Sequence, residues 1–521
     1  IINAIKIPIN KQEDGTKEYL EFPYYFYDLQ LKFNLDFGLD HRLTYSRFYG
    51  DDVLDWSFDE TQNYNYEDNT TARVKRRFGI DWPWGNHTNG LTWRWIVSPT
   101  VVAKTFLSRS RYRFHFNIHS LDQETIIYPD STIYNETAFF FDMYDIILDN
   151  SLESEIIWKA RDGHEITSGF QLKDVNFNLG MDFGVTTLDT SILLTPLDMD
   201  EDTREIAFFI QDKIEVTDKL KVQVGLRGTD YSLHDKLYFD PRLGIKYNWS
   251  DNISLKLNWG IYHQFLTTAN NQDENFRLVD LWMGIPEDKD ASQSQHSILG
   301  LEYLSPSNIF YRVEVYKKDF DNLLTLKQAD AFTENENEFQ SEPFNEFWDT
   351  DAEATGIEFL IKKSSGRLNG WLGYTFAKSK YYNPQSGWHT PSFDRTHTIN
   401  MVTSVEINAD LEFSTAVSTS TGNPYTPIMG RVYDFSHSLN TSTYWYPNNS
   451  FLVGEKNSTR YGDYFRFDIG LTRKHGNLFG LQYDTYWQIM NVTNHVNILG
   501  YTYQTKTDPT GNQMGVQRKK V

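Results

Sequence analysis

The sequence predicts an all-β membrane protein, a transmembrane antiparallel up-and-down β-barrel, and three observations lead to this fold class. The mean hydropathy is −0.56 although 16% of the 521 residues are aromatic, which an apolar outer band around a polar lumen explains. Apolar and polar side chains alternate along many segments, as they do in a strand with two different faces. Short turns alternate with long polar connections, as expected when turns lie on one side of a membrane and loops on the other.

The composition excludes several other classes of protein. A chain without cysteine is not a disulfide scaffold, and a chain this rich in aromatic residues is not intrinsically disordered. The sequence has no run of about 18 apolar residues, which excludes helical membrane spans. A net charge of −22 argues against binding to nucleic acid, because phosphate contacts need clustered Lys and Arg.

The alternation is clearest in three segments, 219–227, 253–263 and 478–490. A single alternating strand would equally fit a half-buried sheet of a soluble protein. In a barrel, one face of each strand points to lipid and the other to a wet lumen. We expect Val222, Val224, Leu255, Leu257, Leu481 and Trp487 to face lipid, and Lys221, Gln223, Lys256 and Gln482 to face the lumen.

The connections between strands indicate which ends share a side of the membrane. Tight turns are predicted at Gly38-Leu39-Asp40, Ser98-Pro99, Thr217-Asp218, Ser250-Asp251-Asn252, Ser305-Pro306-Ser307, Ser365-Gly366-Arg367, Ala409-Asp410 and Gly476-Asn477. Long polar segments are predicted between them at 51–86, 178–203, 265–291, 326–353 and 427–462, outside the cell. A further connection is predicted near 151–161, and it fits the series of tight turns less well.

Aromatic clusters near strand ends are typical of the girdle that forms at bilayer interfaces. They comprise 24–27 and the four tryptophans Trp82, Trp84, Trp93 and Trp95. Ordinary aromatic packing on a sheet is the alternative, and the recurrence of the clusters at strand ends favours the girdle.

Seven short motifs follow one another along the chain. They are Asp240-Pro241-Arg242-Leu243-Gly244, 259–264 (WGIYHQ), 354–359 (ATGIEF), 393–400 (FDRTHTIN), 421–427 (TGNPYTP), 460–468 (RYGDYFRFD) and 491–494 (NVTN). In this order and at this spacing the chain resembles the barrel domain of TonB-dependent outer-membrane receptors, in the form common among Bacteroidota. The resemblance covers most of the chain from about residue 24 onward.

The resemblance implies a location in the bacterial outer membrane, a 22-stranded barrel, an N-terminal plug domain and a partner system, TonB-ExbB-ExbD, that contacts a segment before the plug. No plug and no leader precede the first strand in this sequence, which begins at Ile1 and stops at Val521. We therefore expect 1–521 to be one barrel domain with about 19 strands, from which the first strands, the plug and the last strand are missing. In this count 1–9 is the third strand and 24–36 the fourth.

No motif predicts an enzyme, because the sequence has neither a phosphate loop nor a His-Glu-x-x-His zinc motif. Asp394-Arg395-Thr396-His397 has no nucleophile elbow beside it, so we expect an architectural role, and Gly356 and Gly422 are expected at positions of close backbone approach. No cofactor is expected. Acidic clusters at 198–202 and 349–353 could hold calcium, although solvated acidic loops are the more common case.

Function is expected at the loops. Four loop aromatic residues could stack on a ligand, with loop packing as the alternative: Trp348, Trp388, Tyr444 and Trp445. Two functions remain open: energised uptake of a scarce nutrient (siderophore, cofactor, oligosaccharide or peptide), or a non-transport scaffold in a larger outer-membrane complex. An open porin fits the barrel but not the motifs. Expected partners are membrane lipid or lipopolysaccharide and, for the scaffold in particular, a surface lipoprotein or other outer-membrane subunits.

Overall fold

The protein is described by a computed structural model that covers residues 5–11, 17–66, 70–268, 281–326, 347–384, 386–434, 448–478, 481–507 and 513–520. All regular structure in these residues is β-strand, and the strands pair antiparallel wherever a register is defined. Within this part of the chain, no helix is long and apolar enough to cross a membrane.

The strands are, in chain order, β1 (Ile5–Lys11), β2 (Lys17–Phe22), β3 (Tyr24–Phe37), β4 (His41–Asn65), β5 (Thr71–Ser98), β6 (Val101–Ile127), β7 (Thr132–Arg161), β8 (His164–Thr187), β9 (Ser191–Glu215), β10 (Leu220–Tyr231), β11 (Leu237–Ser250), β12 (Ile253–Gln264), β13 (Leu266–Thr268), β14 (Trp282–Gly284), β15 (Ser292–Leu304), β16 (Ile309–Leu326), β17 (Phe347–Lys363), β18 (Leu368–Asn383), β19 (Gly387–His389), β20 (His397–Asn408), β21 (Leu411–Ser420), β22 (Pro424–Tyr425), β23 (Ile428–Asp434), β24 (Asn448–Val453), β25 (Thr459–Arg460), β26 (Tyr464–Leu478), β27 (Leu481–Ile489), β28 (Tyr501–Thr507) and β29 (Gln513–Lys520).

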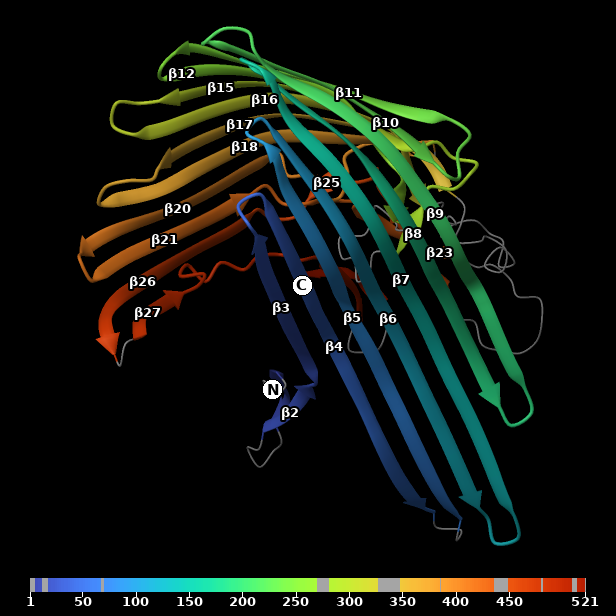
Figure 1. Ribbon diagram of the computed structural model, residues 1–521. Coiled ribbons are helices and arrows are strands. Elements are labelled where there is room, and N and C mark those ends of the chain that lie inside the picture. The colour runs from blue at the N-terminus through green and yellow to red at the C-terminus, as the bar shows by residue number, and fades with distance from the viewer. Residues whose placement is uncertain are drawn as a thin grey trace.

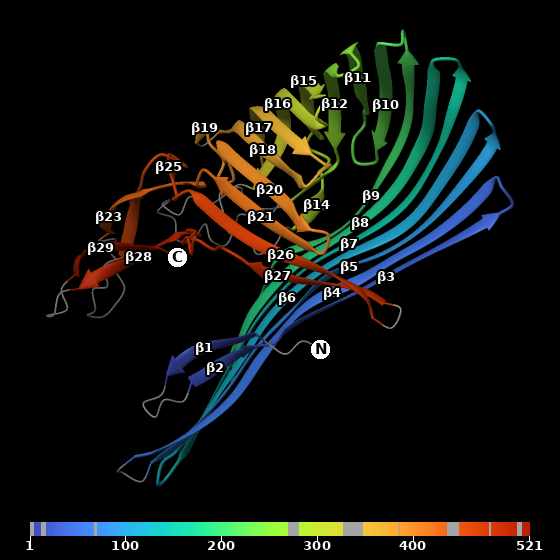
Figure 2. The same cartoon turned by 90° about the vertical axis from the view of Figure 1, so that its left-hand side faces the viewer.

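Nineteen strands form one barrel, and their order follows the chain from β3 to β27 with only the short strands of the connections left out. In Figure 1 the long strands β3 to β9 make one wall, and β10 to β27 curve over to make the other. Figure 2 shows the same two walls after a turn of 90°. The ring returns from β27 to β3, and the described residues give no residue-by-residue register for this seam. The predicted fold class is confirmed.

The tight turns gather at one end of the barrel, which we call the turn end. Short connections at 38–40, 99–100, 251–252, 305–308 and 409–410 lie where the sequence predicts them. The connection expected near 151–161 is instead the two-residue turn Asp162-Gly163, because β7 continues to Arg161. Gly163 has a φ of +78°, which favours glycine there. The turn expected at Gly476-Asn477 lies inside β26, which runs to Leu478.

The sequence predicts loops at 51–86 and 178–203. Both segments lie at the end of the barrel where the long loops are predicted, but the prediction that they are loops is wrong. Residues 51–65 and 71–86 belong to the very long strands β4 and β5, and 178–203 belongs to β8 and β9 around a short turn at 188–190. Beyond the bilayer, both faces of a strand are wet, so the apolar alternation disappears while neighbouring backbones continue to pair. The extended sheet of β4 to β9 therefore projects from the barrel (Figure 1).

The third strand expected at 1–9 is also placed differently. Residues Ile5–Lys11 pair with Lys17–Phe22 in a separate two-stranded sheet, outside the ring. A hairpin satisfies its own backbone hydrogen bonds between two adjacent segments, so it can form apart from the barrel ladder.

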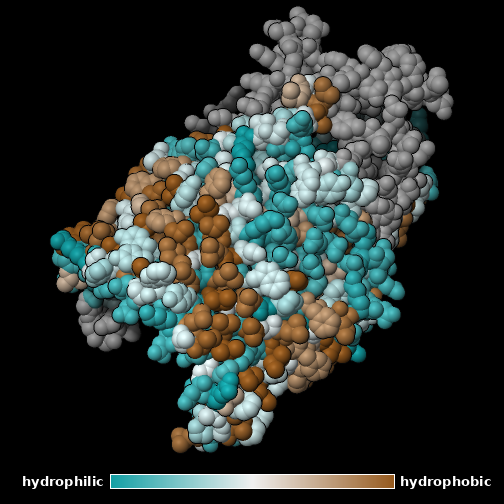
Figure 3. Space-filling model, turned by 90° about the horizontal axis from the view of Figure 1, so that it is seen from above, coloured by the Kyte–Doolittle hydropathy of each residue, from teal (hydrophilic) through white to brown (hydrophobic). Residues whose placement is uncertain are grey.

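The predicted facing of the strands is confirmed where side chains are described. Leu257 pairs with Ile245 and Leu299, and its side chain remains 40% exposed, as expected for a lipid-facing position. Lys256 lies on the other face and its ammonium contacts Glu302 at 2.6 Å. Val224, Leu255 and Trp487 are likewise exposed apolar residues, whereas the side chains of Leu481 and Gln482 lie outside the described residues. Figure 3 shows hydrophobic residues gathered on one face with hydrophilic residues beside them.

The aromatic girdle is only partly confirmed. Trp93 and Trp95 stack with His41 near the turn end and stay exposed on the outer face. Trp82 instead packs edge-on against Phe114 and Phe116, and with Trp84 it occupies the inner face. Trp82 and Trp84 lie in the part of β5 that continues beyond the bilayer, so these aromatic residues serve sheet packing and not a membrane interface.

This topology predicts where a protease cuts intact cells. The turns 128–131 and 188–190 should be cleaved, because they lie at the end that projects away from the turn end. The turns at 251–252 and 305–308 should be spared until the outer membrane is permeabilised. Cleavage is read by mass spectrometry of released peptides. Early cutting at the turn end would contradict the orientation.

Candidate functional site

Three of the predicted motifs meet at the end of the barrel opposite the turn end, which we call the loop end. The group that they form there, the mouth cluster, consists of Ser379, Asp394, Thr396, Gly422 and Arg460. Asp394 is buried, and one of its carboxylate oxygens accepts a hydrogen bond from Arg460 Nη2 at 2.5 Å. The other oxygen accepts from the Ser379 amide at 2.9 Å. Arg460 also donates to the carbonyl oxygens of Asp394 and Gly422, both at 3.0 Å, and to Thr396 Oγ1. The cluster joins the connections before β20 and after β21 to β25.

The glycine of the mouth cluster is needed for space. A Cβ built on Gly422 would lie 2.1 Å from the carbonyl oxygen of Tyr461, closer than any side chain can approach backbone. Gly356 shows the same requirement, because its Cβ would lie 2.8 Å from the carbonyl oxygen of Phe376. Both glycines therefore occupy the close approaches that the sequence predicts.

The last motifs form a second group farther along β26. Asp468 is buried and accepts hydrogen bonds from Arg466 and from the amide of Asn491, the latter at 2.8 Å. Asn497 Oδ1 accepts from the Phe465 amide at 2.9 Å, which fastens the chain after β27 to the start of β26. The motif residues thus tie chain segments together, and none of these contacts resembles a nucleophile and base pair.

A hairpin folds into the barrel between β12 and β15 and covers part of the inner wall. It consists of β13 and β14, and Ile285 beside it is fully buried, with its amide bonded to the Phe265 carbonyl at 3.0 Å. Gly284 lets the hairpin approach the wall, since a Cβ there would lie 2.8 Å from the Tyr231 hydroxyl. The buried apolar residues packed together here are Leu179, Tyr231, Tyr238, Phe265, Leu281, Met283, Ile285, Ala291, Leu324 and Phe347. The hairpin is therefore a fixed part of the mouth.

The hairpin also covers a carboxyl group. Asp145 on β7 is fully buried, and its Oδ2 accepts a hydrogen bond from the Trp282 amide at 2.7 Å. Its Oδ1 has no partner among the described residues. Asp145 lies farther from the turn at Asp162 than the ~9–11 residues with which a strand crosses a bilayer, so it is outside the membrane span. Burial raises the pKa of Asp145 to about 7.

Because of Asp145, we expect the stability of the hairpin to depend on pH. The pKa of Asp145 in the folded protein is about 7, above the value of about 3.9 in the unfolded chain. The folded state therefore loses stability as the pH rises from about 4 to 7. The difference of about three pH units corresponds to a change on the order of 4 kcal/mol. Hydrogen exchange of the Trp282 amide should therefore accelerate over this range beyond its chemical pH dependence. Asp145→Asn should remove the additional acceleration, and an unchanged profile would refute the assignment.

The lumen near the turn end is lined by charges of both signs. A cavity of about 990 Å³ there is bordered by charged residues that include Lys213, Glu215, Lys221, Lys256 and Glu314. Lys213 contacts Glu165 at 3.1 Å, and Lys221 contacts Glu215 across the same wall. Charges paired in this way need water or further polar groups around them, so the lumen wall is suited to a hydrated content.

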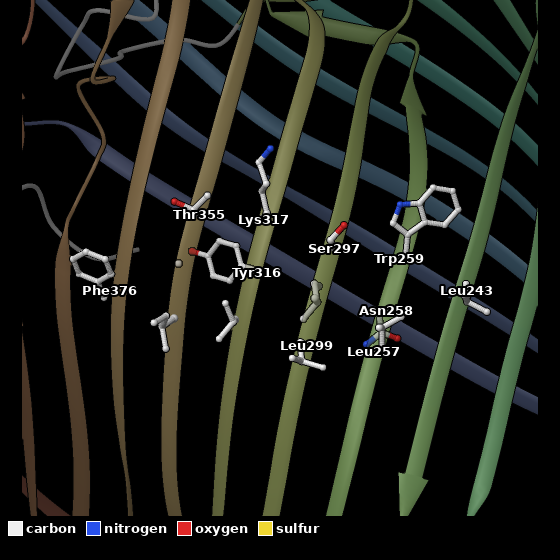
Figure 4. A pocket seen from close by; sticks show the side chains of 14 residues that line it. Leu243, Leu257, Asn258, Trp259, Ser297, Leu299, Tyr316, Lys317, Thr355 and Phe376 are labelled. Atoms are coloured by element: carbon white, nitrogen blue, oxygen red, sulfur yellow. The ribbon is translucent and has the colours of Figure 1, made fainter.

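The second hollow, of about 750 Å³, lies on the other side of the wall (Figure 4). Its apolar lining includes Leu243, Leu257 and Leu299, which belong to the lipid-facing rows of β11, β12 and β15. A shallow apolar hollow in this place contacts acyl chains, and we do not assign a nutrient to it.

The predicted ligand-stacking residues are only partly described. Trp388 on β19 is half exposed and its ring lies 5.6 Å from that of Tyr382. Tyr382 on β18 pairs in turn with Asp351 on β17, the strand that carries Trp348, so the two tryptophans lie at the loop end on the strands that flank β18. Tyr444 and Trp445 lie outside the described residues. A ligand role for these residues stays a prediction.

The acidic clusters also remain untested as calcium sites. Asp200 and Asp202 accept hydrogen bonds from Asn176 Nδ2 at 2.8 and 3.0 Å on the outer face of the projecting sheet. In the described residues, no group of three or more His, Cys, Asp or Glu side chains is arranged to hold a metal ion.

Comparison with known proteins agrees with this architecture. FpvA from P. aeruginosa, solved with an iron-pyoverdine complex, is similar in fold, with 13% identity and a TM-score of 0.55 over 92% of this chain and 67% of that chain. The outer membrane transporter YddB from Escherichia coli is 10% identical, with a TM-score of 0.52 over 98% of this chain and 76% of that chain. A search of curated proteins returns no match. The family model described as TonB dependent receptor-like, beta-barrel matches residues 8–472, and the chain therefore belongs to the TonB-dependent receptors of the bacterial outer membrane.

Proposed function

We propose that this barrel serves energised uptake of a scarce nutrient across the outer membrane, driven by the TonB-ExbB-ExbD system. The observation that carries the proposal is the family match over residues 8–472. The charged lumen supports it, because Lys213, Glu165 and their neighbours line a wet interior through which a polar solute can pass. The buried mouth cluster supports a fixed frame for the loops above that interior. The nutrient belongs to one of four classes: siderophore, cofactor, oligosaccharide or peptide.

The test is uptake by cells that express the whole gene. Isotope-labelled ferric siderophores, vitamin B12, oligosaccharides and peptides are each offered to cells with and without the gene. We expect one class to enter only when the gene is present, and entry to stop when the proton gradient is collapsed or TonB is deleted, because binding alone cannot drive a solute uphill. Uptake that ignores the gradient would leave a passive pore, and no uptake of any class would favour the scaffold role.

A further inference from the structure

The strand β4 has an open backbone edge where the sheet projects beyond the bilayer. β3 pairs with β4 only as far as Leu54, whereas β5 pairs with it as far as Asn65. In the described residues, the segment 55–65 therefore has a partner strand on one side only. The Asp55 amide points to the other side, where it donates to the Pro23 carbonyl at 3.1 Å. Because this direction alternates along a strand, the odd-numbered residues after Asp55 present amide and carbonyl groups that can accept a further strand.

The opposite edge of the projecting sheet is protected. There β9 extends past the end of β10 and, in the described residues, also has one partner strand only. It carries Pro196, a register shift against β8 and the acidic run 198–202, and such features keep an edge from pairing. The segment 55–65 has no proline and pairs with β5 without a register shift, and the charge of Asp59 is compensated by Arg77 at 2.9 Å. The edge of β4 is therefore the unprotected one.

The strand that can continue the ladder on this edge is β2. Only Pro23 separates β2 from β3, and the hydrogen bond from Asp55 to its carbonyl lies one rung beyond the end of β3. Continued without a shift, the register of β3 and β4 sets Lys17–Phe22 opposite residues 56–61. Pro23 has no amide to return a hydrogen bond, which interrupts the ladder and makes this residue a hinge. Figure 1 shows the hairpin of β1 and β2 on the same side of β4 as β3.

The sequences of the two strands match in this register. Leu20 stands opposite Phe58, and Phe22 stands opposite Trp56. Paired residues of an antiparallel ladder share a face, and for the even-numbered residues of β4 this is the inner face of the sheet. Phe58 is 43% exposed, so it has apolar surface that a neighbouring strand can cover. Apolar pairs opposite each other stabilise such a ladder.

The hairpin brings a protected edge of its own. β1 carries Pro8, and its register against β2 shifts between Pro8 and Asn10. With β2 on the edge of β4, the outer strands of the enlarged sheet would be β1 and β9, and each has a proline and a register shift. Glu18 opposite Glu60 opposes the pairing, but this repulsion is screened by water and acts against two apolar pairs.

We propose that β2 docks on the open edge of β4, with Lys17–Phe22 opposite residues 56–61, so that the β1–β2 hairpin extends the projecting sheet by two strands. The docked hairpin would continue the wall of the mouth above β3. It would also remove from the cell surface an edge on which other chains can pair. The interaction is independent of which nutrient, if any, is transported.

Cysteine cross-linking tests the register, because the chain has no cysteine of its own. Even-numbered partners do not exchange backbone hydrogen bonds in this register, and their Cα atoms, about 4.5 Å apart, suit a disulfide. The L20C/F58C variant of the full-length protein should therefore cross-link in intact cells treated with a mild oxidant. L20C/Q62C is the matched control, with its second cysteine on the same face of β4. We expect the disulfide to form at least tenfold faster in L20C/F58C, measured by mass spectrometry of the linked peptides.

Hydrogen exchange tests docking in the unaltered protein. The β4 amides that would bond to β2 are those at residues 57, 59 and 61. The matched reference is the set of edge amides of β9, which point the same way as the Arg204 amide and lie at residues 198, 200 and 202. After correction for intrinsic chemical rates, we expect the β4 amides to exchange at least tenfold more slowly than the β9 amides.

Equal cross-linking of the two cysteine pairs would overturn the proposal, and so would exchange at the β4 edge as fast as at the β9 edge. Protection of the β4 amides without the cross-link would show that another strand occupies the edge. A cross-link without protection would show only a transient contact, and each of these two results also overturns the docking of β2. Because exchange is measured on the parent chain, the test does not depend on whether a cysteine variant folds.

Discussion

Replacing Arg460 by alanine is expected to destabilise the barrel by about 3–5 kcal/mol, the range for removing one partner of a buried ion pair. The reason is that Asp394, which is only 4% exposed, would keep its charge and lose the guanidinium that contacts it at 2.5 Å. Two backbone carbonyl groups, those of Asp394 and Gly422, would lose a donor at the same time. Equilibrium unfolding in urea, followed by tryptophan fluorescence in liposomes, measures the difference.

The matched control for this variant is Arg42→Ala. Arg42 contacts Asp36 at 2.6 Å, nearly the same distance, but both side chains are about half exposed. Water and salt screen such a pair, so we expect no resolved change in the urea midpoint. If Arg460→Ala were as mild as Arg42→Ala, the mouth cluster would not hold the loop end together. In a double-mutant cycle, Asp394→Ala combined with Arg460→Ala should cost clearly less than the sum of the two single variants.

Leu257→Arg is expected to impair membrane insertion by roughly 2–4 kcal/mol, the cost of an arginine on the lipid face near the bilayer midplane. Leu257 lies on the outer face between Ile245 and Leu299, about halfway along the part of β12 that crosses the membrane. The refolding yield into liposomes, measured by gel mobility, should fall accordingly.

The next residue of the same strand provides the control. Asn258 points to the other face, where it borders the charged cavity near the turn end. Asn258→Arg should fold nearly as well as the parent protein, because water and the nearby Glu314 can accommodate the added charge. Equal losses for Leu257→Arg and Asn258→Arg would show that the register of β12 is wrong.

The sequence alone predicted the features that depend on a single strand and on the lipid and water that its two faces contact. Lipid on one side and water on the other impose a period of two, so Leu257 and Lys256 could be assigned to opposite faces without any knowledge of their neighbours. The turns at 38–40, 251–252 and 409–410 were likewise readable, because turn residues act locally. The order of the motifs pointed to the receptor family that the family match then confirmed.

Only the tertiary structure decided the features that depend on neighbours in space. Above the bilayer the lipid no longer selects one face, so the strands at 51–65 and 71–86 have loop-like composition and exist because β4 and β5 pair with each other. Asp394 and Arg460 are 66 residues apart, and the contact that joins them exists because the connections on which they lie meet at the same end of the barrel.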